Sequence, residues 1–306
     1  MHLIIPGALP PHSVAADLLP HVQEHCPELV QRIQRLDAVV TVCPPEETGC
    51  SALEFLELSA RGSSTENGHT FGASLGPLRA GITQPGEPVW IADLCSVAIG
   101  RDGAALAIPD SLGLTQVHAD ALFDAAQPLW SHSGISVLPI GLGRWRVWLA
   151  PDARLRSISP AAVSTLSVSD WWPQAESMKA WRKILNEVQM LWHTHPVNDQ
   201  RAANGLEPIN SLWLYGGASG WKPTPLAKDD QYSNLLAKSF LENDWATWIN
   251  NLPALSKQIA QLPEHARLSL VGERKIVTLS ALQQSWWQRL MPRRTQNWTT
   301  WWIRQN

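Results

Sequence analysis

The sequence predicts an α/β fold, in which a sheet is flanked by helices. Near the N-terminus, an apolar run at 3–5 is followed by apolar residues at helical spacing at 28–36 and by a second apolar run at 39–42. An amphipathic stretch at 178–195 and a buried run at 212–215 repeat this succession in the second half. Because strands that alternate with helices form sheets covered by helices, this order favours the α/β class.

A capping signal marks the next helix. Ser51 and Glu54 fit the S-x-x-E capping box and stand before an apolar stretch, which predicts a helix that begins after Ser51. Residues 61–70 are rich in Gly, Ser, Thr and Asn, and this composition is typical of an exposed loop.

Residues 76–170 differ in pattern from the flanking sequence and predict an inserted α+β subdomain. Helical spacing predicts a helix over 115–129, and alternating apolar residues predict a hairpin over 135–149. The flanking segments, 1–75 and 171–306, would then form a discontinuous α/β core.

The second half of the chain contains further element signals. A short helix at 197–204 stops at Gly205, which suits the left-handed position after a helix end. The strand at 212–215 leads into a glycine-rich turn at 216–220. A strand is expected at 267–271 and a helix at 280–290.

Composition excludes several classes of function. The net charge is −3 over 306 residues, so no basic excess draws the chain onto nucleic acid. No apolar run approaches the roughly 20 residues that span a bilayer, and the opening segment lacks the basic start of a secretory signal. Four cysteines without a C-x-x-C pair do not make a disulfide framework, so a cytoplasmic location with reduced thiols is expected.

Two histidine patterns have a simpler explanation than metal binding. His21, Glu24 and His25 match H-x-x-E-H, in which two histidines one helical turn apart share a zinc ion. This segment is short and lacks a third ligand, so a surface helix is favoured. His193 and His195 stand at a helix end, where capping of the helix is favoured.

Two segments could hold an anion. The glycines at 216–220 follow a strand, and glycine lets backbone N–H groups approach a phosphate. Cys50 and Ser51 precede a helix, whose dipole lowers a thiol pKa and attracts negative charge. Helix capping by Ser51 is the favoured alternative.

The chain contains 17 tryptophans, and two adjacent pairs stand out. Trp286-Trp287 and Trp301-Trp302 cannot both point inward from one helix or strand. At least one member of each pair is therefore expected at a surface, a groove or a subunit contact.

One spacing resembles a known family. It reads H-P-x-N-x-x-R-x-x-x-G-x-x-P-x-N-x-x-x-L-x-G and contains His195, Asn198, Arg201, Gly205, Pro208, Asn210, Leu214 and Gly216. It is similar to a stretch of the archaeal-type, cofactor-independent phosphoglycerate mutases, members of the alkaline phosphatase superfamily. Within that group the chain most resembles the bacterial type E regulatory proteins of the pathogenicity-factor (Rpf) cluster. The resemblance implies an alkaline-phosphatase-like sheet flanked by helices, with an inserted subdomain.

The resemblance also shows where this chain departs from the family. The family's enzymes use two divalent metals held by several Asp and His residues. Pro6-Gly7 resembles the opening Asp-Gly, with proline in place of the metal-binding Asp, and Gly272-Glu273-Arg274 stands where Gly-Asp-His is expected. Cys50 and Ser51 occupy the positions of the nucleophilic serine and the neighbouring Asp. We therefore expect no metal and no other cofactor.

The sequence thus predicts a pseudoenzyme, a regulatory protein that acts by binding. The partner would be a protein or a small anion, with no role for nucleic acid or membrane. The expected ligand-binding residues are Pro6, Gly7, Cys50, Ser51, His195, Asn198, Arg201, Gly216 and Gly217.

Two alternatives remain open. One is a phosphoryl-transfer enzyme of mutase or phosphatase type, with Cys50 or Ser51 as the catalytic residue. The other is a scaffold that binds proteins, or forms a homo-oligomer, through its Trp-rich C-terminal region.

Overall fold

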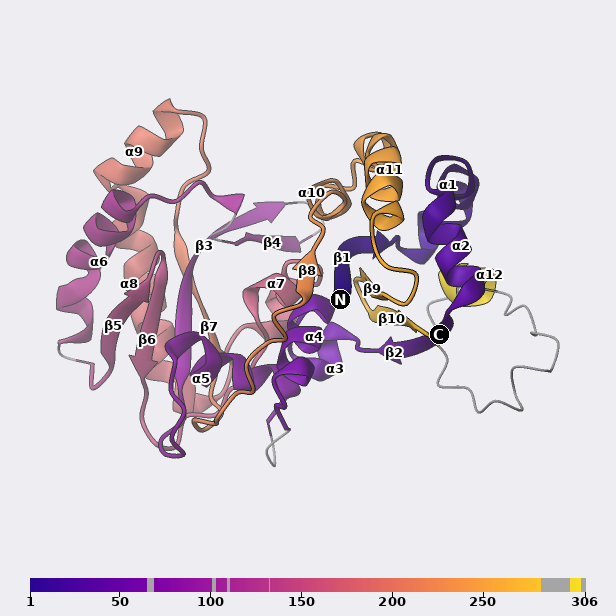
Figure 1. The fold of residues 1–306 in the computed structure, drawn as a ribbon. Coiled ribbons are helices and arrows are strands. Elements are labelled where there is room, and N and C mark those ends of the chain that lie inside the picture. The colour runs from indigo at the N-terminus through magenta and orange to yellow at the C-terminus, as the bar shows by residue number, and fades with distance from the viewer. Residues whose placement is uncertain (65–68, 101–102, 109–110, 132, 282–297, 304–306) are drawn as a thin grey trace. The chain divides into compact units, whose positions relative to one another are not determined.

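The computed structural model describes all residues of the chain except 65–68, 101–102, 109–110, 132, 282–297 and 304–306 (Figure 1). The chain divides into two compact units. Unit 1 contains Met1–Pro44 and Pro225–Asn306, and unit 2 contains Pro45–Thr224. Each unit has a sheet and a hydrophobic core of its own. In the described ranges, no helix is long and apolar enough to cross a membrane.

Unit 1 is a mixed sheet with helices packed on it. Its elements are β1 (His2–Leu9), α1 (His12–His25), α2 (Pro27–Arg35), β2 (Asp37–Val42), β8 (Asp230–Tyr232), α10 (Ala237–Leu241), α11 (Trp245–Ala260), β9 (Arg267–Gly272), β10 (Lys275–Ser280) and α12 (Thr299–Ile303). The strand order is β2-β10-β9-β1-β8. β1 is parallel to β8 and β9, whereas β10 is antiparallel to β9 and β2. The predicted α/β class is confirmed.

Strand β1 is longer than the predicted run and continues through Pro6 and Gly7. Pro6 lies in register with Val271 of β9. Gly7 has a φ of +77°, and a Cβ there would lie 2.7 Å from the Cβ of Phe240. The Gly7 carbonyl accepts a hydrogen bond from the indole N–H of Trp248 at 2.9 Å. These contacts give Gly7 a packing role in the core of unit 1.

The C-terminal tryptophans form part of the core of unit 1. Trp298 and Trp302 are buried, and Trp302 donates from its indole nitrogen to the carbonyl of Ala15 at 3.3 Å. Trp301 is only partly buried, as expected for one member of an adjacent pair. The other pair, Trp286-Trp287, lies outside the described residues.

Unit 2 contains an antiparallel sheet between two groups of helices. Its elements are α3 (Pro45–Thr48), α4 (Ala52–Ala60), η1 (Phe71–Ser74), α5 (Leu75–Ala80), β3 (Trp90–Gly100), β4 (Gly103–Ala107), α6 (Gln116–Trp130), β5 (Ser136–Gly141), β6 (Arg144–Trp148), α7 (Pro160–Val163), η3 (Val168–Trp171), η4 (Glu176–Met178), α8 (Lys179–His193), α9 (Pro196–Ala203) and β7 (Ser211–Gly216). The order is β4-β3-β6-β5, and β7 also pairs with β3.

The alternation of side chains along the strands divides unit 2 into two hydrophobic clusters. On β3, Ala92 and Leu94 face the cluster built with α6 and α8, which lie together on one side of the sheet (Figure 1). Ile91 and Cys95 face the opposite cluster, which includes Leu58 of α4. Because successive residues of a strand point to opposite faces, Asp93 lies on the same face as Ile91.

The compact units have different bounds from the predicted domains. A discontinuous unit with an inserted one is observed, but the inserted unit is 45–224 rather than 76–170. The C-terminal bound differs because β7 pairs with β3 from Ser211 to Gly216 and so joins the sheet of the inserted unit. The N-terminal bound differs because Leu58 of α4 and Leu75 of α5 belong to a hydrophobic cluster of that unit. Local patterns do not show which of two sheets a buried strand joins.

Several predicted elements are confirmed, and several strands were missed. The capping box at Ser51, the helix at 115–129 and the hairpin at 135–149 are present. The strands β4, β8 and β10 were not predicted, and the helix expected at 280–290 falls almost wholly outside the described residues. The long amphipathic helix ends at His193, two residues earlier than expected.

Candidate functional site

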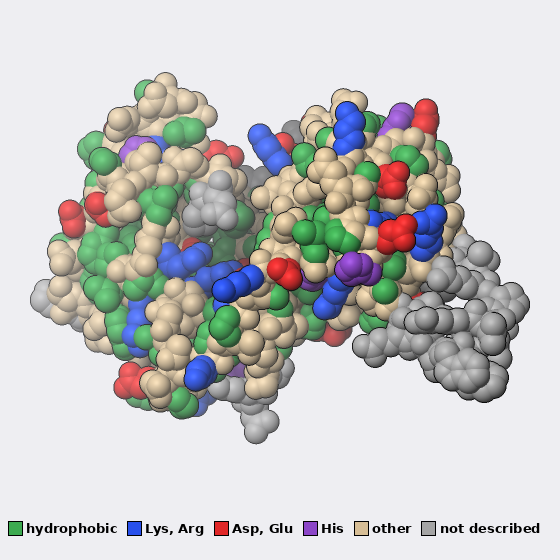
Figure 2. Space-filling view, viewed as in Figure 1, with side chains coloured by type: hydrophobic (Ala, Val, Ile, Leu, Met, Phe, Trp, Pro, Cys, Tyr) green, Lys and Arg blue, Asp and Glu red, His purple; other side chains and the backbone are tan. Residues whose placement is uncertain are grey.

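A polar pocket lies in unit 2 on the face of the sheet that carries Asp93. Its volume is about 320 Å³, and its lining residues are Glu54, Arg79, Asp93, Ile108, Arg144, Pro160, Ala161 and Tyr215. Four of these eight side chains carry a charge, and the four come from α4, α5, β3 and β6. Figure 2 shows a visible surface that is mostly uncharged, with scattered acidic side chains and a group of neighbouring Lys and Arg side chains at one place. The pocket itself brings four charged side chains to one cavity.

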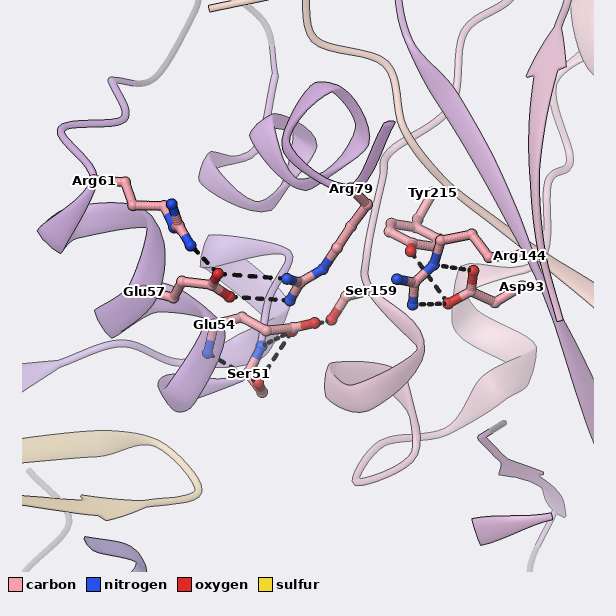
Figure 3. A network of polar contacts seen from close by, with 9 residues as sticks. All are labelled: Ser51, Glu54, Glu57, Arg61, Arg79, Asp93, Arg144, Ser159 and Tyr215. Carbon is pink, nitrogen blue, oxygen red and sulfur yellow. Dashed lines mark hydrogen bonds and ion pairs between the residues drawn. The ribbon is translucent and has the colours of Figure 1, made fainter. Parts of the chain in front are cut away.

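Strand register builds one side of the pocket. Asp93 of β3 is paired with Arg144 of β6, which places the two side chains next to each other. Arg144 Nε lies 2.8 Å from Asp93 Oδ1, and Arg144 Nη2 lies 2.9 Å from Oδ2. The hydroxyl of Tyr215, on β7, donates to Asp93 Oδ2 at 3.1 Å (Figure 3). The carboxylate is thus held by three donors while its side chain is only 3% exposed.

Burial keeps the Tyr215 phenol protonated. Desolvation raises the pKa of Tyr215 well above its ordinary value, and the negative charge of Asp93 raises it further. A protonated phenol can donate, which is the role that its contact with the Asp93 carboxylate requires.

The N-terminus of α4 builds the opposite side of the pocket. Ser51 is the N-cap, and its hydroxyl accepts a hydrogen bond from the Glu54 amide at 3.3 Å. Glu54 Oε2 accepts in return from the Ser51 amide at 2.9 Å and from the Ser51 hydroxyl at 3.0 Å. The Ser159 hydroxyl donates to the same oxygen. The capping box thus fixes a carboxylate at the wall of the pocket.

A third carboxylate orients Arg79. Glu57, one turn after Glu54, accepts from Arg79 Nη2 at 3.0 Å and from Nη1 at 3.4 Å. It also accepts from Arg61 Nε at 3.2 Å. Figure 3 shows the Arg79 side chain extending from α5 toward Glu57, close to the Glu54 carboxylate. Glu57 therefore balances two guanidinium groups with a single negative charge.

The arrangement is suited to binding. Three carboxylates and three guanidinium groups are held in fixed positions by each other and by capping hydroxyls. Fixed donors and acceptors recognise a small polar ligand with little loss of side-chain entropy. Within the described residues, no group of three or more His, Cys, Asp and Glu side chains is arranged to hold a metal ion.

Cys50 and Ser51 lie close to this pocket but are engaged structurally. Cys50 is fully buried, so its thiol is closed to a substrate in this conformation. The Ser51 hydroxyl is committed to the capping box.

Gly216 and Gly217 are required by packing. Their φ angles are +97° and +95°, and a Cβ on Gly216 would lie 2.6 Å from the Val89 carbonyl oxygen. The Gly216 amide donates to the Ser157 hydroxyl at 2.7 Å, and the Gly217 amide donates to the Val89 carbonyl at 2.8 Å. Both amides are therefore occupied, and in this conformation they do not form an anion cradle.

The remaining motif residues connect α8, α9 and β7. His195 is the N-cap of α9 and accepts from the Val197 amide at 3.2 Å. The Asn198 amide group bonds to Trp192 and to both the carbonyl and the amide of Ile209, each at 2.8 Å. These partners belong to the cluster on the face of the sheet opposite to Asp93.

Arg201 has a similar role. Its side chain is completely buried and donates to the backbone carbonyls of Glu207 and Leu112. The conspicuous sequence motif is thus a set of backbone contacts, and it does not reach the pocket. Pro6 and Gly7 belong to unit 1, as described above.

A second polar constellation, in unit 1, was not predicted. His2 Nδ1 lies 3.1 Å from Asp230 Oδ1, and His2 Nε2 lies 2.9 Å from the Ser269 hydroxyl. This is the hydrogen-bond order of a Ser-His-Asp triad. Ser269, however, is completely buried and also bonds to Thr278 at 3.2 Å. These side chains therefore connect strands within the sheet, and in this conformation the hydroxyl is closed to a substrate.

The comparisons with known proteins found partial similarities. No model of a known protein family matches the chain. A segment of 96 residues, 31% of this chain, is 25% identical to a probable 2,3-bisphosphoglycerate-independent phosphoglycerate mutase from Geobacter sulfurreducens. That segment spans only 24% of the length of this relative.

Two solved structures are similar over most of the chain. The cofactor-independent phosphoglycerate mutase from Thermoplasma acidophilum aligns with a TM-score of 0.34 and 14% identity, over 92% of this chain and 90% of that one. The PH0037 protein from Pyrococcus horikoshii aligns with a TM-score of 0.39 and 11% identity, over 92% and 87% of the two chains.

Proposed function

We propose that this protein is a non-catalytic relative of the 2,3-bisphosphoglycerate-independent phosphoglycerate mutases that acts in regulation by binding a small polar ligand. The ligand site is the pocket of unit 2 between Glu54, Arg79, Asp93 and Arg144. The similarity to the Geobacter sulfurreducens mutase supports the relationship. We also propose a regulatory role, as in the bacterial type E regulatory proteins of the Rpf cluster that the sequence resembles. The proposal also includes a cytoplasmic location, which the four free cysteines support.

One observation carries the proposal: the charged side chains of the pocket are already held in place by one another. Asp93 fixes Arg144, and Glu57 fixes Arg79, so both guanidinium groups are held in defined orientations at the wall of the cavity. Preorganised donors of this kind stabilise a bound ligand. The two candidate nucleophiles are not positioned to attack a substrate in this conformation, since Cys50 is buried and Ser51 caps a helix.

Metal content and turnover, measured on the same purified protein, test this function. We expect no stoichiometric metal and no mutase or phosphatase activity above background, with or without added manganese. Metal-dependent turnover that is lost on chelation would overturn the proposal. A protein that binds ligands but has no turnover under any metal condition agrees with it.

A phosphoryl-transfer enzyme is the second candidate, and one contact favours Ser51 over Cys50 as its nucleophile. The Ser51 hydroxyl donates to Glu54 at 3.0 Å, and Glu54 lines the pocket. A carboxylate in that position could accept the hydroxyl proton. If this candidate were correct, Ser51→Gly, which keeps an acceptable N-cap residue, would abolish activity while Cys50→Ala would not.

A further inference from the structure

We infer that the pocket of unit 2 binds a zwitterion, a small molecule that carries one ammonium and one carboxylate group, such as a free α-amino acid. The inference rests on the proposed function, because it takes the pocket to be a binding site. It adds the chemical class of the ligand, which follows from how the charges around the cavity are paired.

Among the described residues, the charges of the network beside the pocket are equal in number and opposite in sign. The network contains the carboxylates of Glu54, Glu57 and Asp93 and the guanidinium groups of Arg61, Arg79 and Arg144. A ligand with a net charge would leave part of that charge uncompensated in a partly enclosed site, which is unfavourable. A ligand with zero net charge preserves the balance.

The charges are paired differently at the three carboxylates of the network. Asp93 and Arg144 form a bidentate pair. Arg61 and Arg79 share the single carboxylate of Glu57, so one positive charge is in excess at that side. Glu54 forms no ion pair in the described part of the chain, so one negative charge is in excess there. The pocket wall therefore carries one positive group, Arg79, and one negative group, Glu54, that form no ion pair with each other among the described residues.

Arg79 is the anchor for the ligand carboxylate. A guanidinium group has five N–H donors, and Arg79 makes two hydrogen bonds to Glu57. Its side chain is 27% exposed and lines the cavity, so the other donors can reach a ligand. An arginine held rigidly by one carboxylate is well suited to bind a second.

Glu54 is the anchor for the ligand ammonium group. Its Oε2 atom accepts three hydrogen bonds, two from Ser51 and one from Ser159. These bonds fix the carboxylate but supply no formal positive charge. An ammonium group would provide that charge, and Oε1 accepts no hydrogen bond from the described residues. Since Glu54 and Arg79 line one cavity without pairing with each other, a ligand with adjacent opposite charges can bridge them.

The remaining lining residues restrict the polarity and size of the ligand's uncharged part. Ile108, Pro160 and Ala161 provide an apolar surface for a carbon skeleton. The volume of about 320 Å³ is at the small end of ligand sites. An amino acid with a short apolar side chain satisfies both restrictions.

The test is calorimetric titration of the full chain with a matched panel of compounds. Leucine, valine and alanine supply both charges, whereas the N-acetyl derivatives lack the ammonium group and the amino-acid amides lack the carboxylate. Inorganic phosphate and 3-phosphoglycerate represent anionic ligands. We expect at least one free amino acid to bind, and removal of either charge from it to weaken binding about tenfold or more.

Two variants test which side chain binds each charged group of the ligand. Glu54→Gln retains a residue that can complete the capping box, so the helix start is preserved while the negative charge is lost. Arg79→Gln removes the positive group. Each is expected to weaken amino-acid binding about tenfold or more. The control Glu176→Gln, at an exposed residue paired with Lys179, should leave binding unchanged.

The outcomes separate the two claims. Binding of phosphate or 3-phosphoglycerate without any free amino acid would overturn the zwitterion inference and leave the binding function in place. Amino-acid binding that Glu54→Gln and Arg79→Gln do not weaken would also overturn it. Metal-dependent turnover would overturn the proposed function itself.

Discussion

The candidate site depends on carboxylates that hold arginines, and Asp93 is the most buried of them. Its two oxygens accept from Arg144 and Tyr215 at 2.8–3.1 Å. Substitution of a buried carboxylate with three donors is expected to lower the free energy of unfolding. Its partners would lose their hydrogen-bond acceptor but would remain shielded from water.

Asp93→Asn is expected to lower the free energy of unfolding by about 2 kcal/mol, less than for a fully buried pair because Arg144 is 34% exposed. Urea unfolding of the purified variant gives the value. Glu176→Gln removes an exposed ion pair and serves as the control, with an expected change below about 0.5 kcal/mol. Equal effects of the two substitutions would show that the Asp93 network contributes nothing special to stability.

His2 gives unit 1 a pH dependence. Burial, together with the nearby charge of Arg267, lowers the pKa of His2 from 6.5. The unfolded chain therefore binds a proton at a higher pH than the folded chain does, so stability decreases as pH falls below about 6.5. Above that pH the imidazole is neutral in both states, and the dependence disappears.

Substitution of this histidine isolates its contribution. We expect the wild-type protein to lose stability between pH 7 and pH 5 more steeply than His2→Gln, because carboxylates contribute equally to both proteins. Thermal unfolding across this pH range measures the difference. Parallel curves for the two proteins would contradict the assigned direction of the pKa shift.

At the scale of elements, close backbone packing explains the glycines at the end of β7. The Cα of Gly216 lies against α5, where a Cβ would come 2.9 Å from the Cα of Gly76. The left-handed conformation adds strain for any other residue. The strand end is thus fixed by packing against α5 and by the backbone of Val89.

Gly216→Ala is expected to destabilise the protein by about 2–4 kcal/mol, through overpacking and an unfavourable φ. Gly134 also has a positive φ but has no atom within 4 Å of an added Cβ, so Gly134→Ala isolates the backbone strain at about 1 kcal/mol. Chemical unfolding of both variants separates the two costs. If Gly216→Ala were tolerated as well as Gly134→Ala, the close packing at β7 would be wrong.

Elements with local signals could be predicted from the sequence, and those defined by partners could not. The capping box at Ser51 and Glu54 is a local pattern, and the structure contains both of its hydrogen bonds. The hairpin of β5 and β6 has its own turn residues. By contrast, the sequence does not show that β7 pairs with β3, because that pairing joins residues more than 100 positions apart.

The site was missed for the same reason. Arg79, Asp93, Arg144 and Tyr215 have no motif spacing, and strand pairing together with helix packing brings them to one cavity. Residues with conspicuous spacing, such as Asn198 and Arg201, bind backbone groups instead. The opposite charges of Asp93 and Arg144, which face each other on β3 and β6, were the available signal. This signal can be recognised only when the pairing register of the two strands is known.

At the scale of the whole molecule, the continuous segment 45–224 contains a complete sheet, two hydrophobic clusters and the pocket. Unit 1 is built from two separate segments and needs both. A segment with its own core can fold independently.

Residues 45–224, expressed alone, are therefore expected to unfold cooperatively and to retain the ligand-binding behaviour of the full chain. Circular dichroism during thermal unfolding and titration with the compounds that bind the full chain measure both properties. A fragment without cooperative unfolding would contradict the division into two units.

The place where a ligand binds distinguishes the pocket of unit 2 from every other candidate site. The direct measurement is a crystal structure of the full chain soaked with the tightest-binding compound from the titrations. We expect ligand density between the side chains of Glu54 and Arg79, with Cys50 covered and unmodified. Density instead beside Pro6 and Gly7, or a covalent adduct on Cys50 or Ser51, would contradict it.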